Sequence, residues 1–286
     1  MNRRSADRSL REFIGRHERL FVLTGAGCST DSGIPDYRDA HGEWKRTQPV
    51  RYRAFVGDEW TRRRYWARSL LGWARFGGAS PNEAHHALAR LERQGRTTQL
   101  VTQNVDGLHQ AAGSAAVIDL HGRLDIVRCM SCDHRISRES LQGELLRLNP
   151  GWADLDARAA PDGDADLTGV DFAEFAVPAC EECGGILKPG VVFFGESVPR
   201  NRVLEAMNAL EQADAMLIVG SSLMVYSGFR FAHRAAQTGK PIAAVNLGRT
   251  RADDLFALKV TERCATALAF LLDDLLSTST ETAAVD

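Results

Sequence analysis

The sequence predicts an α/β protein with a Rossmann-like, doubly wound parallel sheet, a small zinc-binding module and a helical insertion. Three observations lead to this fold class: short apolar runs, several of which lack polar alternation, helical patterns between them, and two separated C-x-x-C pairs. Uniformly apolar runs are expected of strands that are buried on both faces of a parallel sheet. The runs occupy residues 20–23, 99–102, 117–120, 216–219, 242–245 and 256–260.

Helical patterns separate these runs, as a doubly wound sheet requires. The clearest one offers Ser80 as N-cap, Pro81 at the first helical position and Glu83 to complete a capping box. Gly95 follows as the stop signal. Similar spacing predicts helices over the first twenty residues, 201–214 and 228–240.

Two segments interrupt the alternation of strands and helices. Residues 40–79 carry four of the five tryptophans and many arginines, which predicts a helical insertion. Residues 126–187 hold both cysteine pairs and an acidic stretch at 150–175, which we interpret as a surface loop because β-branched residues are few. The remaining ranges, 1–39, 80–125 and 188–286, are assigned to the Rossmann-like domain that contains the parallel sheet.

The overall composition argues against several classes of protein. The 286 residues are 44% hydrophobic, and the net charge of −2 gives no electrostatic case for binding nucleic acid or an anionic membrane. No apolar run approaches the roughly 20 residues of a membrane span. The arginine-rich start lacks the apolar segment of a secretion signal, so a cytoplasmic location is expected.

Four of the six cysteines form two pairs that suit a metal ion. Two C-x-x-C pairs can place four thiolates around zinc at about 2.3 Å, and four cysteine ligands leave no open position, so the metal should be structural. One pair alone would also fit a redox motif, and a small zinc ribbon could bind nucleic acid, although its acidic surroundings count against that. The expected zinc ligands are Cys129, Cys132, Cys180 and Cys183.

A glycine turn follows the first apolar run. In TGAGCSTDSGIPDYR, residues 24–38, Gly25 and Gly27 fit G-x-G, but Thr30 stands where a dinucleotide fingerprint has its third glycine. Such a turn lets backbone N–H groups approach a phosphate closely, although an ordinary tight turn has the same pattern. The mixed polar residues that follow predict a loop that folds over the rest of a ligand.

Polar residues also follow other predicted strands, where a parallel sheet opens its crevice. His121 follows the third run and is a general-base candidate, because the pKa of imidazole lies near neutrality. The carboxyl ends of these strands should converge on one cleft. The other strand-end residues are Gln103, Asn104 and Asp106 after the second run, Gly220, Ser221 and Ser222 after the fourth, and Asn246, Leu247 and Gly248 after the fifth.

The motifs run in a fixed order from about residue 10 to residue 270. They are GAGCSTDSGIPDYR, TQNVDGLH, LHG, the two C-x-x-C pairs, LKPGVVFFGESVP, GSSLMVYS and VNLG. Together they resemble the sirtuins, a family of NAD-dependent protein deacylases. The strings RYWAR, APDGD, VVFFGESV and GSSLMVYSGFRF are similar to the class II branch of that family.

The resemblance implies that NAD is bound and consumed as a co-substrate. His121 would be the catalytic base, and Asn104 and Asp106 would line the nicotinamide pocket and take part in catalysis. The implied NAD contacts are Gly25, Ala26 and Gly27 at the diphosphate, the loop Ile34, Pro35, Asp36, Tyr37 and Arg38, the residues Gln103, Asn104, Val105 and Asp106 near the nicotinamide ribose, and Gly220, Ser221, Ser222, Asn246, Leu247, Gly248 and Cys264 around the adenosine half.

The implied reaction moves an acyl group from a lysine side chain of a protein to ADP-ribose. The amide oxygen of the acyl-lysine attacks C1′ of the nicotinamide ribose and nicotinamide leaves, after which His121 activates a ribose hydroxyl. Water completes the reaction and gives free lysine and O-acyl-ADP-ribose. One alternative is mono-ADP-ribosyl transfer to another acceptor. A second alternative is a non-catalytic NAD or ADP-ribose-binding module, and mere binding would need none of His121, Asn104 and Asp106.

Two further stretches are implied to contact the substrate. The stretch GVVFFGE, residues 190–196, would offer a strand edge to an extended peptide, although the apolar run by itself favours a plain buried strand. Its implied contacts are Val192, Phe193, Phe194, Gly195 and Glu196.

Tyr65 and Arg68 are spaced i, i+3 and should share one helix face. Sirtuins that remove acidic acyl groups use a Tyr-x-x-Arg pair in this region, so longer or acidic acyl groups are expected to compete with acetyl. The alternative is that Arg68 joins the neighbouring arginines at 62–64 on a solvated face.

Overall fold

The computed structural model describes residues 3–45, 48–155, 158–159, 163–167 and 169–273. Its centre is a six-stranded sheet in the order β11-β10-β9-β1-β2-β3, in which every neighbouring pair is parallel. All six apolar runs are strands of this sheet, as predicted. They are β1 (Leu20–Thr24), β2 (Thr97–Thr102), β3 (Val117–Asp119), β9 (Ala215–Val219), β10 (Ile242–Val245) and β11 (Leu258–Val260).

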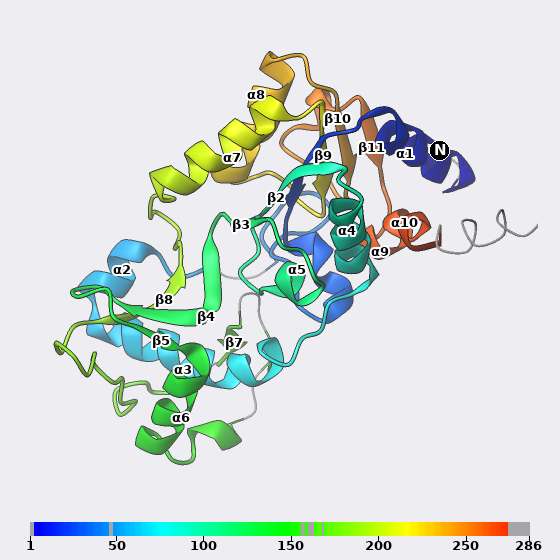
Figure 1. Cartoon of the computed structure of the whole chain (residues 1–286). Helices are drawn as coiled ribbons and strands as arrows, with labels where there is room; N and C mark the ends of the chain where they lie inside the picture. Colours follow the sequence, from blue (N-terminus) through cyan, green and yellow to red (C-terminus); the bar gives the residue numbers. More distant parts are fainter. Residues whose placement is uncertain (1–2, 46–47, 156–157, 160–162, 168, 274–286) are drawn as a thin grey trace, which may run out of the picture.

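Helices cover both faces of this sheet, which explains the lack of polar alternation in its strands. Every residue of β1, β9 and β10 is buried. One core packs under α1 (Arg3–Arg16), α4 (Glu83–Arg93), α9 (Cys264–Leu268) and α10 (Phe270–Asp273). The other packs under α7 (Arg200–Gln212) and α8 (Tyr226–Gln237), on the opposite side in Figure 1. We call this sheet with its helices the sheet lobe.

The start of α4 differs from the sequence prediction. Ser80 does not cap this helix; the N-cap is Asn82, whose side chain accepts a hydrogen bond from the N–H of Ala84. His85, and not Glu83, completes the capping box, because its Nδ1 accepts from the N–H of Asn82 at 3.2 Å. Asn82 has a second task, since its amide also donates to the backbone oxygen of Cys28. The cap thereby ties α4 to the loop after β1.

A second body, which we call the small lobe, comprises residues 48–76 and 122–193 as far as they are described. Its sheet has the order β5-β4-β8 and is antiparallel. One hydrophobic core joins this sheet to the helices of the predicted insertion, with Trp66 and Phe55 fully buried in it. The elements are α2 (Tyr52–Gly57), α3 (Glu59–Phe76), β4 (Gly122–Cys129), β5 (Arg135–Ser137), α6 (Arg138–Leu148), β6 (Arg158–Ala159), β7 (Ala165–Asp166) and β8 (Leu187–Val191).

The acidic stretch at 150–175 is not a plain surface loop, and that part of the sequence interpretation is wrong. Phe172 and Phe175 are buried in the small-lobe core. The stretch also presses on α3, because a Cβ placed on Gly72 would lie 2.1 Å from the backbone oxygen of Gly163. Its few β-branched residues therefore indicated irregular backbone rather than exposure.

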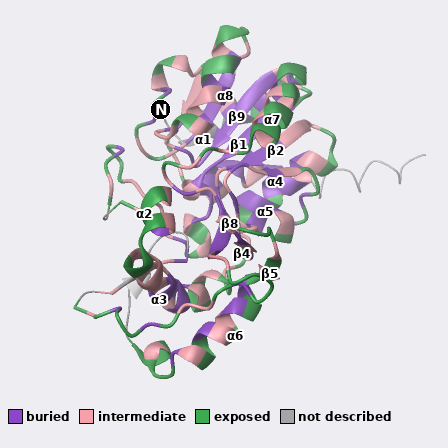
Figure 2. Cartoon of the chain, turned by 90° about the vertical axis from the view of Figure 1, so that its left-hand side faces the viewer, coloured by how far each residue is buried: buried purple, intermediate pink, exposed green. Residues whose placement is uncertain are grey.

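Short helical turns complete the structure: η1 (Ala26–Cys28), η2 (Thr30–Ser32), α5 (Leu108–Ala111), η3 (Trp152–Asp154) and η4 (Asp253–Leu255). Colouring by burial shows the purple strands of the large sheet between helices whose outer surfaces are green (Figure 2). Within the described ranges, no helix combines the length and apolar character needed to cross a membrane.

Candidate active site

A large cavity of 1460 Å³ opens at the carboxyl ends of the parallel strands and extends to the small lobe. Its lining draws on the ends of β1, β2, β9 and β10 and on α3 and β8. Every residue that the sequence nominated for catalysis, NAD contact or substrate contact lies on this lining. The four cysteines of the predicted metal site lie outside it.

Two glycine turns pack directly on each other at the floor of the cavity. A Cβ on Gly25 would lie 2.9 Å from the oxygen of Gly220, and a Cβ on Gly27 would lie 3.0 Å from the Cα of Gly220. Gly220 itself has φ +66° and would place a Cβ 2.2 Å from the N of Cys28. Because no side chain fits between them, only glycine allows the two turns to pack this closely, and the backbone of both turns lines the cavity. The chain after Gly27 forms 3-10 turns and no long helix, which accounts for Thr30 at the third fingerprint position.

His121 lies between β3 and β4 with both ring nitrogens engaged. Its Nδ1 is 2.9 Å from the backbone oxygen of Gln103, which can only accept, so the proton resides on Nδ1. Its Nε2 is 2.8 Å from Oγ of Ser227, whose hydroxyl therefore donates to it. Burial lowers the pKa of His121 to about 4, an effect that the bond to Gln103 only partly offsets. The imidazole is thus neutral at physiological pH, with its basic Nε2 on the cavity side.

The residue that follows His121 has a special backbone. Gly122 has φ +84°, and a Cβ there would lie 2.0 Å from the oxygen of Gly190. The N–H of Val192 donates to the backbone oxygen of His121 at 2.7 Å. The base candidate is therefore held by the sheet lobe through Gln103 and by the small lobe through Val192.

Asn104 and Asp106 meet at one hydroxyl group. The Ser29 hydroxyl donates to Asp106 at 2.7 Å and accepts from the Asn104 amide at 3.0 Å. The same amide donates to the oxygen of Gly25 at 3.1 Å, which links the end of β2 to the glycine turn. Burial raises the pKa of Asp106, although the bonds from the Leu108 N–H and Ser29 oppose this rise. The three side chains form a rigid polar wall beside the cavity.

The loop at 34–38 is anchored by the segment that follows it. The guanidinium of Arg38 lies 4.1 Å from the centre of the Trp44 ring and donates to the oxygen of Gly42 at 2.7 Å. Asp36 forms an ion pair with Lys45. Tyr37 meets the Trp44 ring edge to face. The loop therefore stands as one wall of the cavity, held by aromatic and charged contacts.

The turn after β10 and the start of α9 close another side of the cavity. The Asn246 amide donates to the oxygen of Gly248 at 3.0 Å, and a Cβ on Gly248 would lie 3.0 Å from Ala40. Leu247 is 59% exposed and lies at the rim. Cys264 is buried, and burial raises the pKa of its thiol to about 12, so it is an uncharged lining residue.

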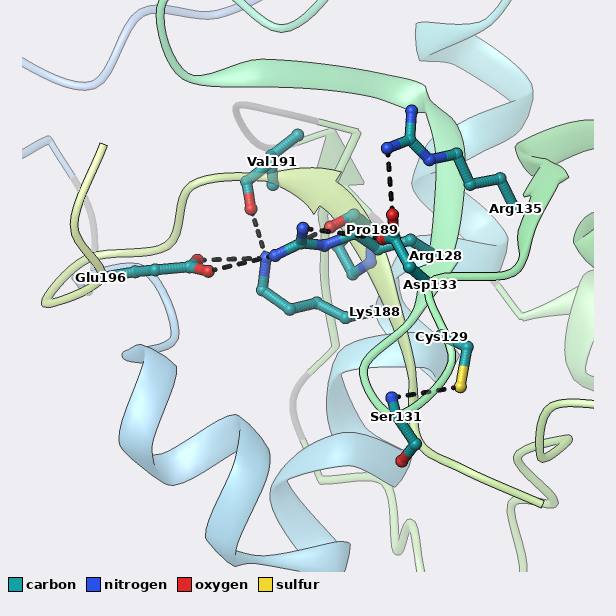
Figure 3. A network of polar contacts seen from close by, with 9 residues as sticks. All are labelled: Arg128, Cys129, Ser131, Asp133, Arg135, Lys188, Pro189, Val191 and Glu196. Carbon is teal, nitrogen blue, oxygen red and sulfur yellow. Dashed lines mark hydrogen bonds and ion pairs between the residues drawn. The ribbon is translucent and has the colours of Figure 1, made fainter. Parts of the chain in front are cut away.

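A buried ion pair supports the wall that Phe193 and Phe194 contribute (Figure 3). The side chain of Lys188 is buried, and its ammonium lies 3.0 Å from a carboxylate oxygen of Glu196 and donates to the backbone oxygen of Val191. The same carboxylate accepts from the N–H of Phe193 at 2.9 Å. The tight turn 193–196 is therefore held from inside by Lys188.

Tyr65 and Arg68 share a face of α3 and both line the cavity, as their spacing predicted. Arg68 does not join a solvated face: its side chain is 16% exposed and forms a bidentate pair with Asp164, at 2.9 and 2.7 Å. Burial raises the pKa of Asp164, and the charge of Arg68 opposes that rise. Burial also raises the pKa of Tyr65, so its hydroxyl keeps its proton.

The four paired cysteines come together in the small lobe. Their sulfur atoms all lie within 4.8 Å of one another. The separation is 3.5 Å between Cys129 and Cys183, 3.8 Å between Cys132 and Cys180, and 3.3 Å between Cys132 and Cys183. A tetrahedral zinc ion with bonds of about 2.3 Å has sulfurs about 3.8 Å apart, so this donor set fits zinc. The site is structural, because all four ligands come from the protein.

Sequence reasoning missed four residues that shape the site. Ser227 lay in a quoted motif, and Ser29 stood in the polar loop, yet only the fold shows their bonds to His121 and Asp106. Asp164 lies 96 residues from its partner Arg68, and no local pattern connects them. Lys188 carries no sequence sign of burial.

Fold and site define a class of protein: an enzyme that binds a dinucleotide at a parallel sheet and holds a neutral histidine against it, with a zinc module alongside. Residues 25–227 match the model of the Sir2 family. The chain belongs to the Sir2 family.

Named relatives span nearly the whole chain. An "NAD-dependent protein deacetylase 2" of Bradyrhizobium diazoefficiens is 70% identical over 93% of this chain and 98% of its own. An "NAD-dependent protein deacetylase" of Xanthomonas campestris is 68% identical over 92% of this chain and 90% of its own. The "NAD-dependent protein deacylase Sirt4" of Drosophila melanogaster is 43% identical over 92% of this chain and 86% of its own.

Solved structures of related proteins have the same fold. One described as "Sir2-p53 peptide-NAD+" superposes with a TM-score of 0.76 at 29% identity and covers 93% of this chain and 97% of its own. A "Sir2 homolog-NAD complex" superposes with a TM-score of 0.71 at 32% identity and covers 93% of this chain and 92% of its own.

Proposed function

We propose that the chain is an NAD-dependent protein-lysine deacetylase, and more generally a deacylase, that releases nicotinamide and O-acyl-ADP-ribose. The observation that carries this proposal is the neutral His121, with its proton on Nδ1 and Nε2 on the side of a cavity that the glycine turns also line. The relatives at 63–70% identity, all named as NAD-dependent protein deacetylases, support it. Because the acyl group passes to ADP-ribose, the reaction is formally a transfer.

The residues divide the reaction between them. The backbone around Gly25, Gly27 and Gly220 receives the diphosphate, because backbone N–H groups of such turns can bind phosphate and all three residues line the cavity. Asn104, Asp106 and Ser29 form a fixed polar wall at the nicotinamide end, and the loop at 34–38 excludes water from the bond that breaks. Val105, Gln103 and the turn 246–248 complete the binding surface for NAD, with Cys264 beside the adenosine.

His121 acts as the general base in the second half of the reaction. With Nδ1–H bonded to Gln103, its Nε2 accepts the proton of a ribose hydroxyl, and the Ser227 hydroxyl holds the ring in place until then. The Gln103 carbonyl and the Ser227 hydroxyl together fix the orientation of the imidazole ring, which a productive proton transfer requires.

The protein substrate lies against the turn 192–196 and the segment after Leu223. Leu223 has a left-handed φ of +57° although it is not glycine, which bends the chain sharply at the cavity edge. The acyl group extends toward Tyr65 and Arg68. Because Asp164 already pairs with Arg68, an acidic acyl group must compete with that carboxylate, and neutral groups enter without such competition.

The expected zinc ion would be structural, and we place the chain in the cytoplasm. The four thiolates would hold the ion without an open position, so it would serve the fold and not the reaction. Among the described residues all six cysteines are free of disulfides, which is consistent with a cytoplasmic location. The net charge of −2 gives no reason to expect a nucleic-acid partner.

One experiment tests the function directly. The protein is incubated with an acetyl-lysine peptide, with and without NAD, and the products are separated by mass spectrometry. We expect nicotinamide, free lysine peptide and O-acetyl-ADP-ribose in equal amounts, only when NAD is present. A peptide or protein that gains ADP-ribose while the acetyl group stays on lysine would replace this proposal with ADP-ribosyl transfer.

A further inference from the structure

Three arginines lie on the cavity lining or close to His121: Arg200, Arg202 and Arg230. Arg200 begins α7 and Arg230 lies in α8, and both line the cavity. Arg202 lies close enough to His121 that its charge, like that of Arg230, helps burial to lower the pKa of His121. We propose that this arginine cluster binds acidic side chains of the substrate protein next to the acyl-lysine, an inference that rests on the proposed deacylase function.

The arginine cluster is not neutralised from within, as far as the described part of the chain shows. No ion pair joins Arg200, Arg202 or Arg230 to an acidic group there. Among acidic groups, Asp119 attracts Arg202 most strongly. Both carboxylate oxygens of Asp119, however, accept hydrogen bonds from the amide of Gln110 at 3.0 Å. Arg128 and Arg135 also repel Arg202, although both pair with Asp133 and Arg128 also lies 3.7 Å from Glu196.

Arg230 gives a second, independent sign of a missing partner. Its Nε is buried and has no hydrogen-bond acceptor among the described residues. Its guanidinium instead lies 5.1 Å from the centre of the Tyr226 ring. A guanidinium cannot lose its proton in a protein, so an unsatisfied buried N–H stays costly until an acceptor arrives. A carboxylate from a bound peptide would supply that acceptor and a complementary charge.

The position of the arginine cluster matches the path proposed for the substrate. Arg200 follows the wall segment 192–196 by four residues, and Arg230 lies one helical turn after Ser227, which bonds His121. The two arginines therefore extend from the two segments between which the acyl-lysine peptide would lie. Acidic residues of a substrate would meet them on either side of the modified lysine.

The test uses three acetyl-lysine peptides of equal length whose flanking residues are acidic, neutral or basic. For the wild-type protein with zinc bound, we expect kcat/KM to be about tenfold higher for the acidic than for the neutral peptide, and this preference to shrink at high salt. Arg230→Gln and Arg200→Gln should reduce the preference by raising KM for the acidic peptide. Taking the ratio of the two peptides cancels any effect of these changes on His121 itself.

Arg234→Gln is the matched control, because Arg234 also lies on α8 but pairs with Glu211 away from the cavity. It should keep the wild-type preference. Arg230→Glu should invert the order and favour the basic peptide, which a mere loss of folding would not do. An equal kcat/KM for all three peptides, or an effect of Arg230→Gln on KM for NAD alone, would overturn the inference. Failure of the neutral peptide to react at all would instead count against the deacylase function.

Discussion

The sheet lobe and the small lobe reach stability by different means. The sheet lobe has two cores of aliphatic side chains, one on each face of the parallel sheet, and its central strands are wholly buried. The small lobe has a single core with many aromatic rings, and it adds buried charged groups: Arg138 at 1% exposure and Lys188 at 0%. It also holds the cysteine cluster.

This difference shows where single changes matter most. Apolar contacts in the sheet lobe are numerous and similar, so neighbouring side chains can repack after a conservative apolar substitution. The small lobe depends on a few specific anchors, each of which leaves a buried charge or an unpaired group when it is removed. The cavity lies between the two lobes, so damage to the small lobe should alter substrate binding before it disrupts the parallel sheet.

Removal of zinc should have the largest effect, because it should destabilise the small lobe and leave the sheet lobe folded. A chelator, or Cys132→Ser, should abolish activity and expose the amides of the small lobe to hydrogen exchange, since metal binding and folding are coupled in such sites. The amides of the parallel sheet should remain protected. Cys28→Ala, a change of a buried cysteine outside the cluster, should retain one zinc ion per chain. If the amides of both lobes lost their protection from hydrogen exchange together, the two lobes would not differ in the way proposed here.

Replacement of His121, the proposed general base, should have the second largest effect. His121→Ala should lower kcat by about 10²–10⁴-fold, the usual contribution of a general base, with little change in thermal stability. Ser227→Ala should cost less, because the bond from Gln103 still orients the ring. Steady-state kinetics and a melting curve measure both effects. Undiminished turnover by His121→Ala would remove the histidine from the mechanism.

The internal support of the substrate wall ranks third. Lys188→Met leaves the Glu196 carboxylate without its buried cation and should destabilise the protein by about 3–5 kcal/mol. KM for the peptide should rise while KM for NAD stays near its original value. The double change Lys188→Met with Glu196→Gln should recover part of the stability in denaturant unfolding, and strict additivity of the two single changes would argue against a pair.

A smaller, selective effect is expected at the acyl end of the cavity. Asp164→Asn releases the guanidinium of Arg68 and should raise kcat/KM for glutaryl-lysine, relative to acetyl-lysine, by about tenfold. Asp154→Asn, in the same stretch but exposed, serves as the control. If wild type already prefers glutaryl-lysine and Asp164→Asn leaves the ratio unchanged, Asp164 has no part in acyl choice.

The mildest expected effect is that of pH on activity. Because burial lowers the pKa of His121 to about 4, kcat/KM should stay level as the pH falls from 8 to 5, with no decline near 6.5. The same depressed pKa stabilises the fold fully above the unfolded value of about 6.5, and this stability is lost as the pH falls toward 4. An acid limb centred near 6.5 in the pH–rate profile would show that the imidazole is solvated.

The sequence predicted the sheet lobe far better than the small lobe, for a physical reason. The central strands of the parallel sheet are short apolar runs, and polar residues directly after several strands reveal the cleft, so both signals are local. The contact of Arg68 with Asp164 and the burial of Lys188 arise only when distant segments meet. Local rules also gave the wrong cap for α4, since Ser80 and Asn82 are both good N-caps and the Cys28 carbonyl decides for Asn82.

The absence of a side chain at position 122 has a consequence for the chemistry of its neighbour. At Gly122 the chain turns with φ +84° from β3, the edge strand of the parallel sheet, into β4 of the antiparallel sheet, with no room for even a methyl group. His121 is thus the final residue of one rigid framework and is bonded to the next. Because His121 is bonded to the sheet lobe through Gln103 and to the small lobe through Val192, we expect the imidazole to stay in place if the spacing between the two lobes changes.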